Sequence, residues 1–159
     1  MVTRRPARKS VLWDSAVMSD ESNLRSIRLS RTAQGRYRIE NARGGVLDIG
    51  HGEDADFTPV ELLLAAIAGC TAIDVDFLTT KKSEPSRFDV SASGIKVADD
   101  DGNRLEDIAI GFDVTFPDDD AGRQMAERLP TAVERSHDRL CTVSRTVELG
   151  TPVVTGLSS

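Results

Sequence analysis

The chain has 159 residues, a length typical of a single domain with one hydrophobic core. Acidic residues outnumber basic ones, 26 to 20, so overall charge gives no reason to expect nucleic-acid binding. The two cysteines are too few for a disulfide-built secreted scaffold, and they do not form a CxxC pair. Composition therefore favours small-molecule chemistry.

The amino-terminal residues 1–22 show no apolar periodicity and predict a flexible tail, followed by a single domain over residues 23–159. The basic start MVTRRPARKS precedes an apolar run, VLW, that an aspartate ends at once, which is not the pattern of a signal peptide. The apolar stretch 58–80 is interrupted by acidic residues, among them Glu61 and Asp74, so it lacks the uninterrupted run of a membrane span. We therefore expect a cytoplasmic protein without a membrane partner.

Strands are expected first along the chain. Apolar and polar residues alternate over 24–29, and Gln34-Gly35 offers a turn into a second strand near residues 37–40. The short run VLDI at 46–49 could add a third strand. These patterns predict an amino-terminal hairpin with one further strand.

A long helix is expected from residue 58 to about residue 80. Thr58 is a suitable N-cap, a proline occupies the first helical position, and Glu61 can close a capping box. Apolar residues then nearly encircle the element, which is typical of a helix buried on most sides.

A second hairpin and further helical sequence follow. Residues 88–97 alternate, with a change of phase near Gly94 that indicates a bulge, and residues 108–116 alternate strictly. Residues 119–141 return to a helical pattern that Pro130 should break or kink.

Residues 151–157 resemble a final strand. The order of strands, long helix, strands, helix and strand is that of an α+β fold.

The sequence pattern alone does not decide whether the two cysteines are reactive. A thiol is a nucleophile only as the thiolate, which needs positive charge, a helix amino terminus or hydrogen-bond donors nearby. Cys70 lies well inside the expected helix, and Asp74 one turn later opposes its ionisation. Cys141 has His137 and Arg145 one turn away on either side, which could lower its pKa if the helix persists, or could be solvated surface residues. Each cysteine is thus either an inert buried thiol or half of a reactive pair.

A zinc site built from His51, Cys70, His137 and Cys141 is not favoured. Their spacing matches no zinc finger or zinc ribbon, and no two of these residues lie two to four positions apart within a loop. We therefore expect neither a metal nor another cofactor.

The stretch TPVELLLAAIAGCTAIDV at 58–75, followed by a helix ending in CTVSRTVE, resembles the OsmC/Ohr family of osmotically induced and organic-hydroperoxide-resistance proteins. The resemblance runs from about Leu24 to the carboxyl terminus. It implies an OsmC-like fold, with antiparallel sheets and a long buried central helix, in an intertwined homodimer with active sites at the subunit interface. It also implies a peroxidase of the oxidative-stress response that reduces organic hydroperoxides and is itself reduced by an external dithiol.

The resemblance assigns roles to individual residues. Cys70 matches the peroxidatic cysteine, whose sulfenic acid Cys141 captures as a disulfide. The family's glutamate directly follows the helix-opening proline, whereas here the acid is Glu61, one position later and on the opposite side of an ideal helix from Cys70. Glu61 is thus either a helix cap or a catalytic acid supplied by the other subunit. Of the hairpin arginines that could activate Cys70, we choose Arg31 over Arg36.

The sequence is also compatible with two other functions. One is a non-catalytic OsmC-like stress protein that binds a small hydrophobic ligand at the dimer interface, which the shifted glutamate favours. The other is a structural dimer whose thiols are simply buried.

Overall fold

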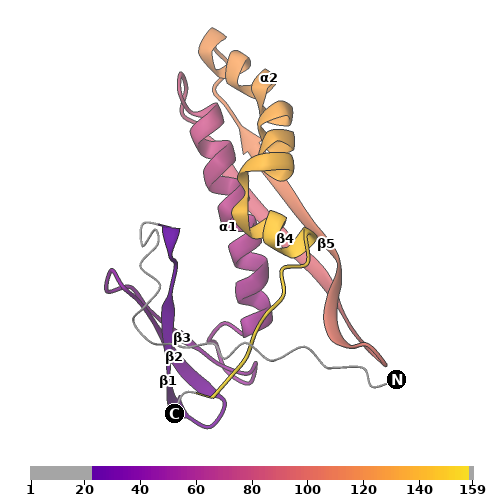
Figure 1. Ribbon diagram of the computed structural model, residues 1–159. Coiled ribbons are helices and arrows are strands. Elements are labelled where there is room, and N and C mark those ends of the chain that lie inside the picture. The colour runs from indigo at the N-terminus through magenta and orange to yellow at the C-terminus, as the bar shows by residue number, and fades with distance from the viewer. Residues whose placement is uncertain (1–22, 158–159) are drawn as a thin grey trace.

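The computed structural model describes residues 23–157, so the tail predicted for residues 1–22 lies outside the described part of the chain. The fold is α+β, with antiparallel sheets and helices (Figure 1). The elements in chain order are β1 (Ile27–Ala33), β2 (Arg36–Asn41), β3 (Val46–Ile49), α1 (Pro59–Thr79), β4 (Arg87–Asp99), β5 (Gly102–Thr115), α2 (Asp120–Arg135), a π-helical turn η2 (Ser136–Leu140) and α3 (Thr142–Glu148).

The amino-terminal strands form the expected antiparallel sheet in the order β1–β2–β3. The turn between β1 and β2 falls at Gln34-Gly35, where Gly35 has a φ of 69°, a left-handed conformation that favours glycine. Figure 1 shows this sheet near the end of α1 at which the helix begins, while β4–β5 and α2 lie along the rest of the helix.

Helix α1 begins as the sequence predicts. The Thr58 side chain accepts a hydrogen bond from the Glu61 amide at 3.3 Å, and the Glu61 carboxylate accepts one from the Thr58 amide at 2.8 Å. This reciprocal pair is a complete capping box, with a proline at the first turn. The helix therefore starts at a fixed residue, which sets the position of Cys70 along it.

The predicted burial of α1 on most sides is wrong for the single chain. Its buried side chains recur every fourth residue along one stripe: Ile67, Thr71, Val75 and Thr79. Ile73 and Phe77, on another face, are 59% and 70% exposed. The reason is that α2, β4, η2 and α3 pack against one side of the helix only. A single chain thus leaves an apolar face of its longest helix uncovered.

By length and mean hydropathy alone α1 could cross a membrane, so its acidic residues do not exclude a span as the sequence suggested. The core helix of a globular protein passes the same test, and here α1 packs against two further helices and a β-ribbon.

The second hairpin follows the prediction closely. β4 pairs with β5 in antiparallel register, and the register shifts between Ser93 and Ile95, which places the bulge at Gly94. Phe88 and Phe112 meet edge to face across the pair, with ring centroids 6.3 Å apart. This ribbon contacts α1 through β4.

After β5, Pro130 does not break the helix, which was one of the two outcomes expected of it, and the expected final strand does not form. Pro130 lies inside α2 without breaking it, and α2 continues to Arg135. Pro130 and Ala126, the residue whose carbonyl loses its helical donor, are both exposed, so water can satisfy that carbonyl. The strand expected at 151–157 is absent, because this segment has no strand partner among the described residues.

Candidate functional site

The fold brings Cys70 and Cys141 together although they are far apart in the sequence. Cys70 lies in the middle of α1, and Cys141 stands at the junction of η2 and α3, both of which pack against α1. The two thiols interact, because Cys141 raises the pKa of Cys70 and the Cys70 thiol lowers the pKa of Cys141. Both thiols are free; Cys141 is 0% exposed, whereas Cys70 is partly exposed.

Cys141 is the N-cap residue of α3. Its sulfur accepts a hydrogen bond from the Ser144 amide at 3.4 Å, in the manner of a capping serine or aspartate. The Ser144 hydroxyl lies 3.1 Å from the same sulfur, and the Thr71 hydroxyl lies 3.4 Å from it. The sulfur is therefore enclosed by hydrogen-bond donors from both α1 and α3.

These donors favour the thiolate form of Cys141. Burial raises the pKa of this thiol, but hydrogen bonds from the Ser144 hydroxyl, the Thr71 hydroxyl, the Ser144 amide and the Cys70 thiol outweigh burial and leave the pKa below its usual value. Cys141 is thus the first of the pair to ionise.

Cys70 behaves in the opposite way. Burial raises the pKa of this thiol, and its hydrogen bond and charge interaction with Cys141 raise it further. The backbone amides of Val143 and Thr142, at the start of α3, act in the other direction without reversing the shift. Of the two thiols, Cys141 therefore ionises at the lower pH, and Cys70 keeps its proton to a higher pH.

The helical face predicted to join Cys141 with His137 and Arg145 is not formed. The chain leaves the π-helical turn and is extended at Cys141, with φ −67° and ψ 100°, so helix does not persist through this residue. His137 and Arg145 both pair with Glu148 instead, at 3.5 Å and 2.6 Å.

Sequence reasoning missed Thr71 and Ser144 as partners of the Cys141 sulfur. A local signal exists for Ser144, since it stands at the third helical position after a capping residue. The contact of Thr71 with Cys141 depends on tertiary packing and has no local signal.

Glu61 and the hairpin arginines are not joined to this pair in the single chain. The Glu61 carboxylate is held by Thr58, and those hydrogen bonds to the Thr58 amide and hydroxyl lower its pKa. Arg36 pairs with Asp54 and Asp56. Arg31 is exposed on β1 and makes no hydrogen bond or ion pair within the part of the chain that the structure describes.

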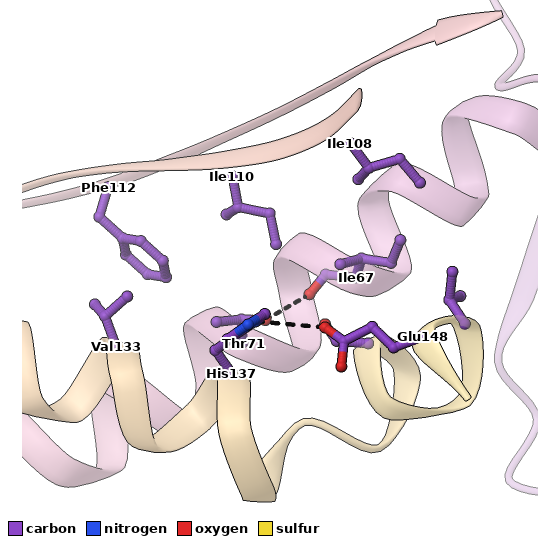
Figure 2. Close-up of a pocket in the computed structure, with 10 residues that line it drawn as sticks. Ile67, Thr71, Ile108, Ile110, Phe112, Val133, His137 and Glu148 are labelled. Atoms are coloured by element: carbon purple, nitrogen blue, oxygen red, sulfur yellow. Dashed lines mark hydrogen bonds and ion pairs between the residues drawn. The ribbon is translucent and has the colours of Figure 1, made fainter. Parts of the chain in front are cut away.

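An apolar cavity of about 330 Å³ (Figure 2) is lined by neighbours of Cys141 but by neither cysteine itself. Its walls come from α1, β5, α2, η2 and α3, and Thr71 and Ser144, which contact the Cys141 sulfur, are among the lining residues. Figure 2 shows isoleucine and phenylalanine side chains of β5 facing α1, with the His137–Glu148 pair on the opposite side. A small apolar molecule could therefore lie against two residues that contact the Cys141 sulfur.

The four residues considered for zinc do not converge. His51 lies near Glu53, at 3.7 Å, and His137 pairs with Glu148. Across residues 23–157, no three His, Cys, Asp or Glu side chains are grouped closely enough to hold a metal ion.

The protein has an α+β fold in which a cysteine on the long apolar helix lies near a second cysteine that caps another helix. It is therefore a protein with a paired-thiol site. Within that class the chain belongs to the OsmC-like protein family, whose signature matches residues 50–156. An uncharacterized protein of Mycobacterium tuberculosis is 31% identical over 128 residues, which cover 79% of this chain and 90% of the relative.

Solved structures share the fold. An OsmC-like protein of unknown function from Vibrio cholerae matches with a TM-score of 0.66 at 14% identity, covering 79% of this chain and 94% of that one. An organic hydroperoxide resistance protein from Elizabethkingia anophelis matches with a TM-score of 0.52 at 14% identity, covering 77% and 89%. At such identities the likeness establishes the fold alone.

Proposed function

We propose that the chain is a cysteine-based peroxidase that reduces organic hydroperoxides through Cys70 and a Cys70–Cys141 disulfide. The observation that carries the proposal is the interaction of these two thiols, which the fold brings together from the middle of α1 and the start of α3. Buried cysteines with a purely structural role need no such partner. The structural similarity to an organic hydroperoxide resistance protein is consistent with this chemistry.

The proposed cycle assigns one role to each sulfur. The Cys70 thiolate attacks the distal peroxide oxygen, the O–O bond breaks, and the alkoxide leaves as an alcohol after taking the proton that Cys141 received from Cys70. The Cys141 thiolate so restored attacks the Cys70 sulfur of the sulfenic acid, the S–O bond breaks, and hydroxide leaves as water after taking a proton from solvent. We assign Cys70 as the peroxidatic residue because this residue is partly exposed, whereas Cys141 is fully buried.

The raised pKa of Cys70 does not prevent this role. Cys141 has the lower pKa of the pair, so its thiolate is the neighbouring base that can take the Cys70 proton as the peroxide approaches. The amides of Val143 and Thr142 then favour the Cys70 thiolate.

A homodimer belongs to the proposal, because the single chain leaves apolar surface uncovered. Ile73 and Phe77 on α1 are more than half exposed, as are Leu24 and Ile27 near and on β1. Burying such side chains contributes about 1.5–3 kcal/mol each. A second copy that covers α1 would also bring a second β1–β2 hairpin near the thiols. We place the protein in the cytoplasm, where thiols are kept reduced.

Arg31→Ala should raise the pKa of Cys70 in the dimer, because Arg31 of a partner chain is the cation proposed to stabilise the Cys70 thiolate. The pH profile of Cys70 alkylation by iodoacetamide, read by peptide mass spectrometry, should shift to higher pH. Arg36→Ala is the matched control, since Arg36 is already paired with Asp54 and Asp56. An unchanged Arg31→Ala profile would remove Arg31 from the site. Glu61 keeps its capping role in this proposal and is a catalytic acid only if the partner's copy reaches Cys70.

The test of the function is stopped-flow consumption of cumene hydroperoxide by reduced protein. Without reductant, each chain should consume one equivalent much faster than free cysteine does, and a dithiol should convert this burst into turnover. Consumption no faster than that by free cysteine would exclude the peroxidase.

The cavity beside the thiols favours a second candidate, a non-catalytic protein that binds a small hydrophobic ligand. The notable feature is an apolar space of about 330 Å³ within the chain, a size that small ligands occupy in other proteins. This alternative keeps both thiols reduced after peroxide. Retained thiols together with a ligand seen by native mass spectrometry would favour it over the peroxidase.

A further inference from the structure

We propose that Thr71 and Ser144 are positioning residues that make Cys141 the leaving group when the Cys70–Cys141 disulfide is reduced, so that the external dithiol attacks Cys70. This inference rests on the proposed function and names the sulfur that the reductant meets. It is carried by the unequal exposure of the two sulfurs and by the hydrogen-bond donors around one of them.

Access decides which sulfur is attacked. Displacement at a disulfide needs an incoming thiolate in line with the S–S bond, on the side opposite the leaving sulfur. Cys141 is 0% exposed, and Thr71 and Ser144 flank its sulfur. Cys70 is partly exposed, so an incoming thiolate can reach its sulfur.

Leaving-group stability points the same way. A thiol of lower pKa leaves a disulfide faster. In the structure with both thiols free, the Ser144 amide lies 3.4 Å and the Ser144 hydroxyl 3.1 Å from the Cys141 sulfur, so these donors can stabilise it as a leaving thiolate. Cys70 has no side-chain hydroxyl donor of this kind among the described residues.

Thr71 can respond to the charge on this sulfur. Its single hydroxyl hydrogen has two acceptors within reach, the Ile67 carbonyl oxygen at 3.0 Å and the Cys141 sulfur at 3.4 Å. In the disulfide the sulfur is a poor acceptor, so the hydroxyl donates to Ile67. Once Cys141 leaves as a thiolate, the same hydrogen can turn toward the negative sulfur, which is the stronger acceptor.

Reduction of the disulfide needs no reductant other than the external dithiol. An external thiolate forms a bond to the Cys70 sulfur, the Cys70–Cys141 bond breaks, and its electron pair goes to Cys141 as thiolate. The second thiol of the dithiol, once deprotonated, attacks the reductant's own sulfur in the mixed disulfide. Cys70 then leaves as thiolate and takes a proton, and the reductant is released as a cyclic disulfide, oxidised by two electrons.

The test begins from protein oxidised with diamide, which forms the disulfide whether or not the protein is a peroxidase. The oxidised protein is mixed with 2-mercaptoethanol, quenched in acid, alkylated with N-ethylmaleimide and mapped by peptide mass spectrometry. We expect the mercaptoethanol adduct on Cys70 and the maleimide on Cys141. An adduct on Cys141 overturns the proposal while leaving the peroxidase intact, and failure of reduced protein to consume peroxide in a separate assay rejects the peroxidase alone.

Variants test the positioning role through rates of reduction by dithiothreitol. Thr71→Val and Ser144→Ala should each slow reduction about threefold, and the double variant about tenfold, if each raises the pKa of Cys141 by about one unit at a Brønsted sensitivity near 0.5. Thr79→Val is the matched control, because Thr79 is equally buried on the same stripe of α1 and bonds only the Val75 carbonyl.

The pH profile of thiolate absorbance separates positioning from packing. It should shift to higher pH in the Thr71 and Ser144 variants and stay in place for Thr79→Val. Thr71→Ser, which keeps the hydroxyl, should restore the wild-type rate and profile. A double variant that is reduced at the wild-type rate overturns the proposal.

Discussion

Replacing Cys70 by serine should abolish the fast reaction with cumene hydroperoxide, slowing single-turnover consumption by more than about 100-fold. Serine keeps the size and polarity of the side chain but lacks an ionisable sulfur, so the nucleophile is lost while α1 stays intact. Cys70 is only partly buried, and the exchange therefore costs little stability. Stopped-flow measurement under pseudo-first-order conditions gives the rate directly.

Cys141→Ser is the informative comparison. This variant should still react once with peroxide, since Cys70 is retained, but should stop at a sulfenic acid that dimedone traps. Loss of the Cys141 thiolate also removes the acceptor of the Cys70 proton, so the first turnover should slow without disappearing. If Cys70→Ser reacts as fast as wild type, Cys70 is not the peroxidatic residue.

A double change of Ile73 and Phe77 to glutamate should convert the protein to a monomer. In a twofold dimer each replacement occurs twice, and each removes apolar burial of about 1.5–3 kcal/mol and adds a charge that must be desolvated. Since 1.4 kcal/mol corresponds to a factor of ten, the dimer should dissociate at least about 100-fold more readily. Sedimentation velocity over a concentration series measures this change.

The control for the interface variant places a charge elsewhere. Thr131→Glu adds a negative charge to an exposed position on α2 and should leave the association unchanged. Both variants should fold, because Ile73 and Phe77 are 59% and 70% exposed in the single chain. A wild-type protein that sediments as a monomer at micromolar concentration would refute the proposed dimer outright.

Local patterns predicted much of the fold. The start of α1 follows from Thr58 and Glu61 because a capping box involves only neighbouring backbone. The Gln34-Gly35 turn and the bulge at Gly94 follow likewise from residues that permit those backbone conformations. The α+β class follows from the order of these elements.

Features that depend on distant packing were not predictable in this way. The apolar pattern of α1 does not tell which of its faces one chain covers, so it overstated burial at Ile73 and Phe77. Pro130 suggested a break in α2, but the helix continues because water can satisfy the carbonyl that loses its helical donor. The chain departs from regular α-helix later, at η2. Residues 151–157 have the composition of a strand but lack a pairing partner among the described residues.

For the candidate site, the choice of cysteines came from the resemblance and their environment came from the structure. No spacing rule places Cys70 beside Cys141, because their contact depends on how η2 and α3 fold back on α1. The helical spacing of His137, Cys141 and Arg145 suggested charged neighbours, whereas hydroxyl and amide donors surround the sulfur. The roles proposed for Glu61 and Arg31 beyond one chain rest on the proposed dimer.

The most direct test of the paired-thiol account is the mass of the reduced protein after one equivalent of cumene hydroperoxide. The account predicts that the intact chain loses two hydrogens and that digestion yields one peptide pair joined through Cys70 and Cys141. A chain of unchanged mass with both thiols free, or a Cys70 oxidised beyond the sulfenic acid while Cys141 stays reduced, would contradict it.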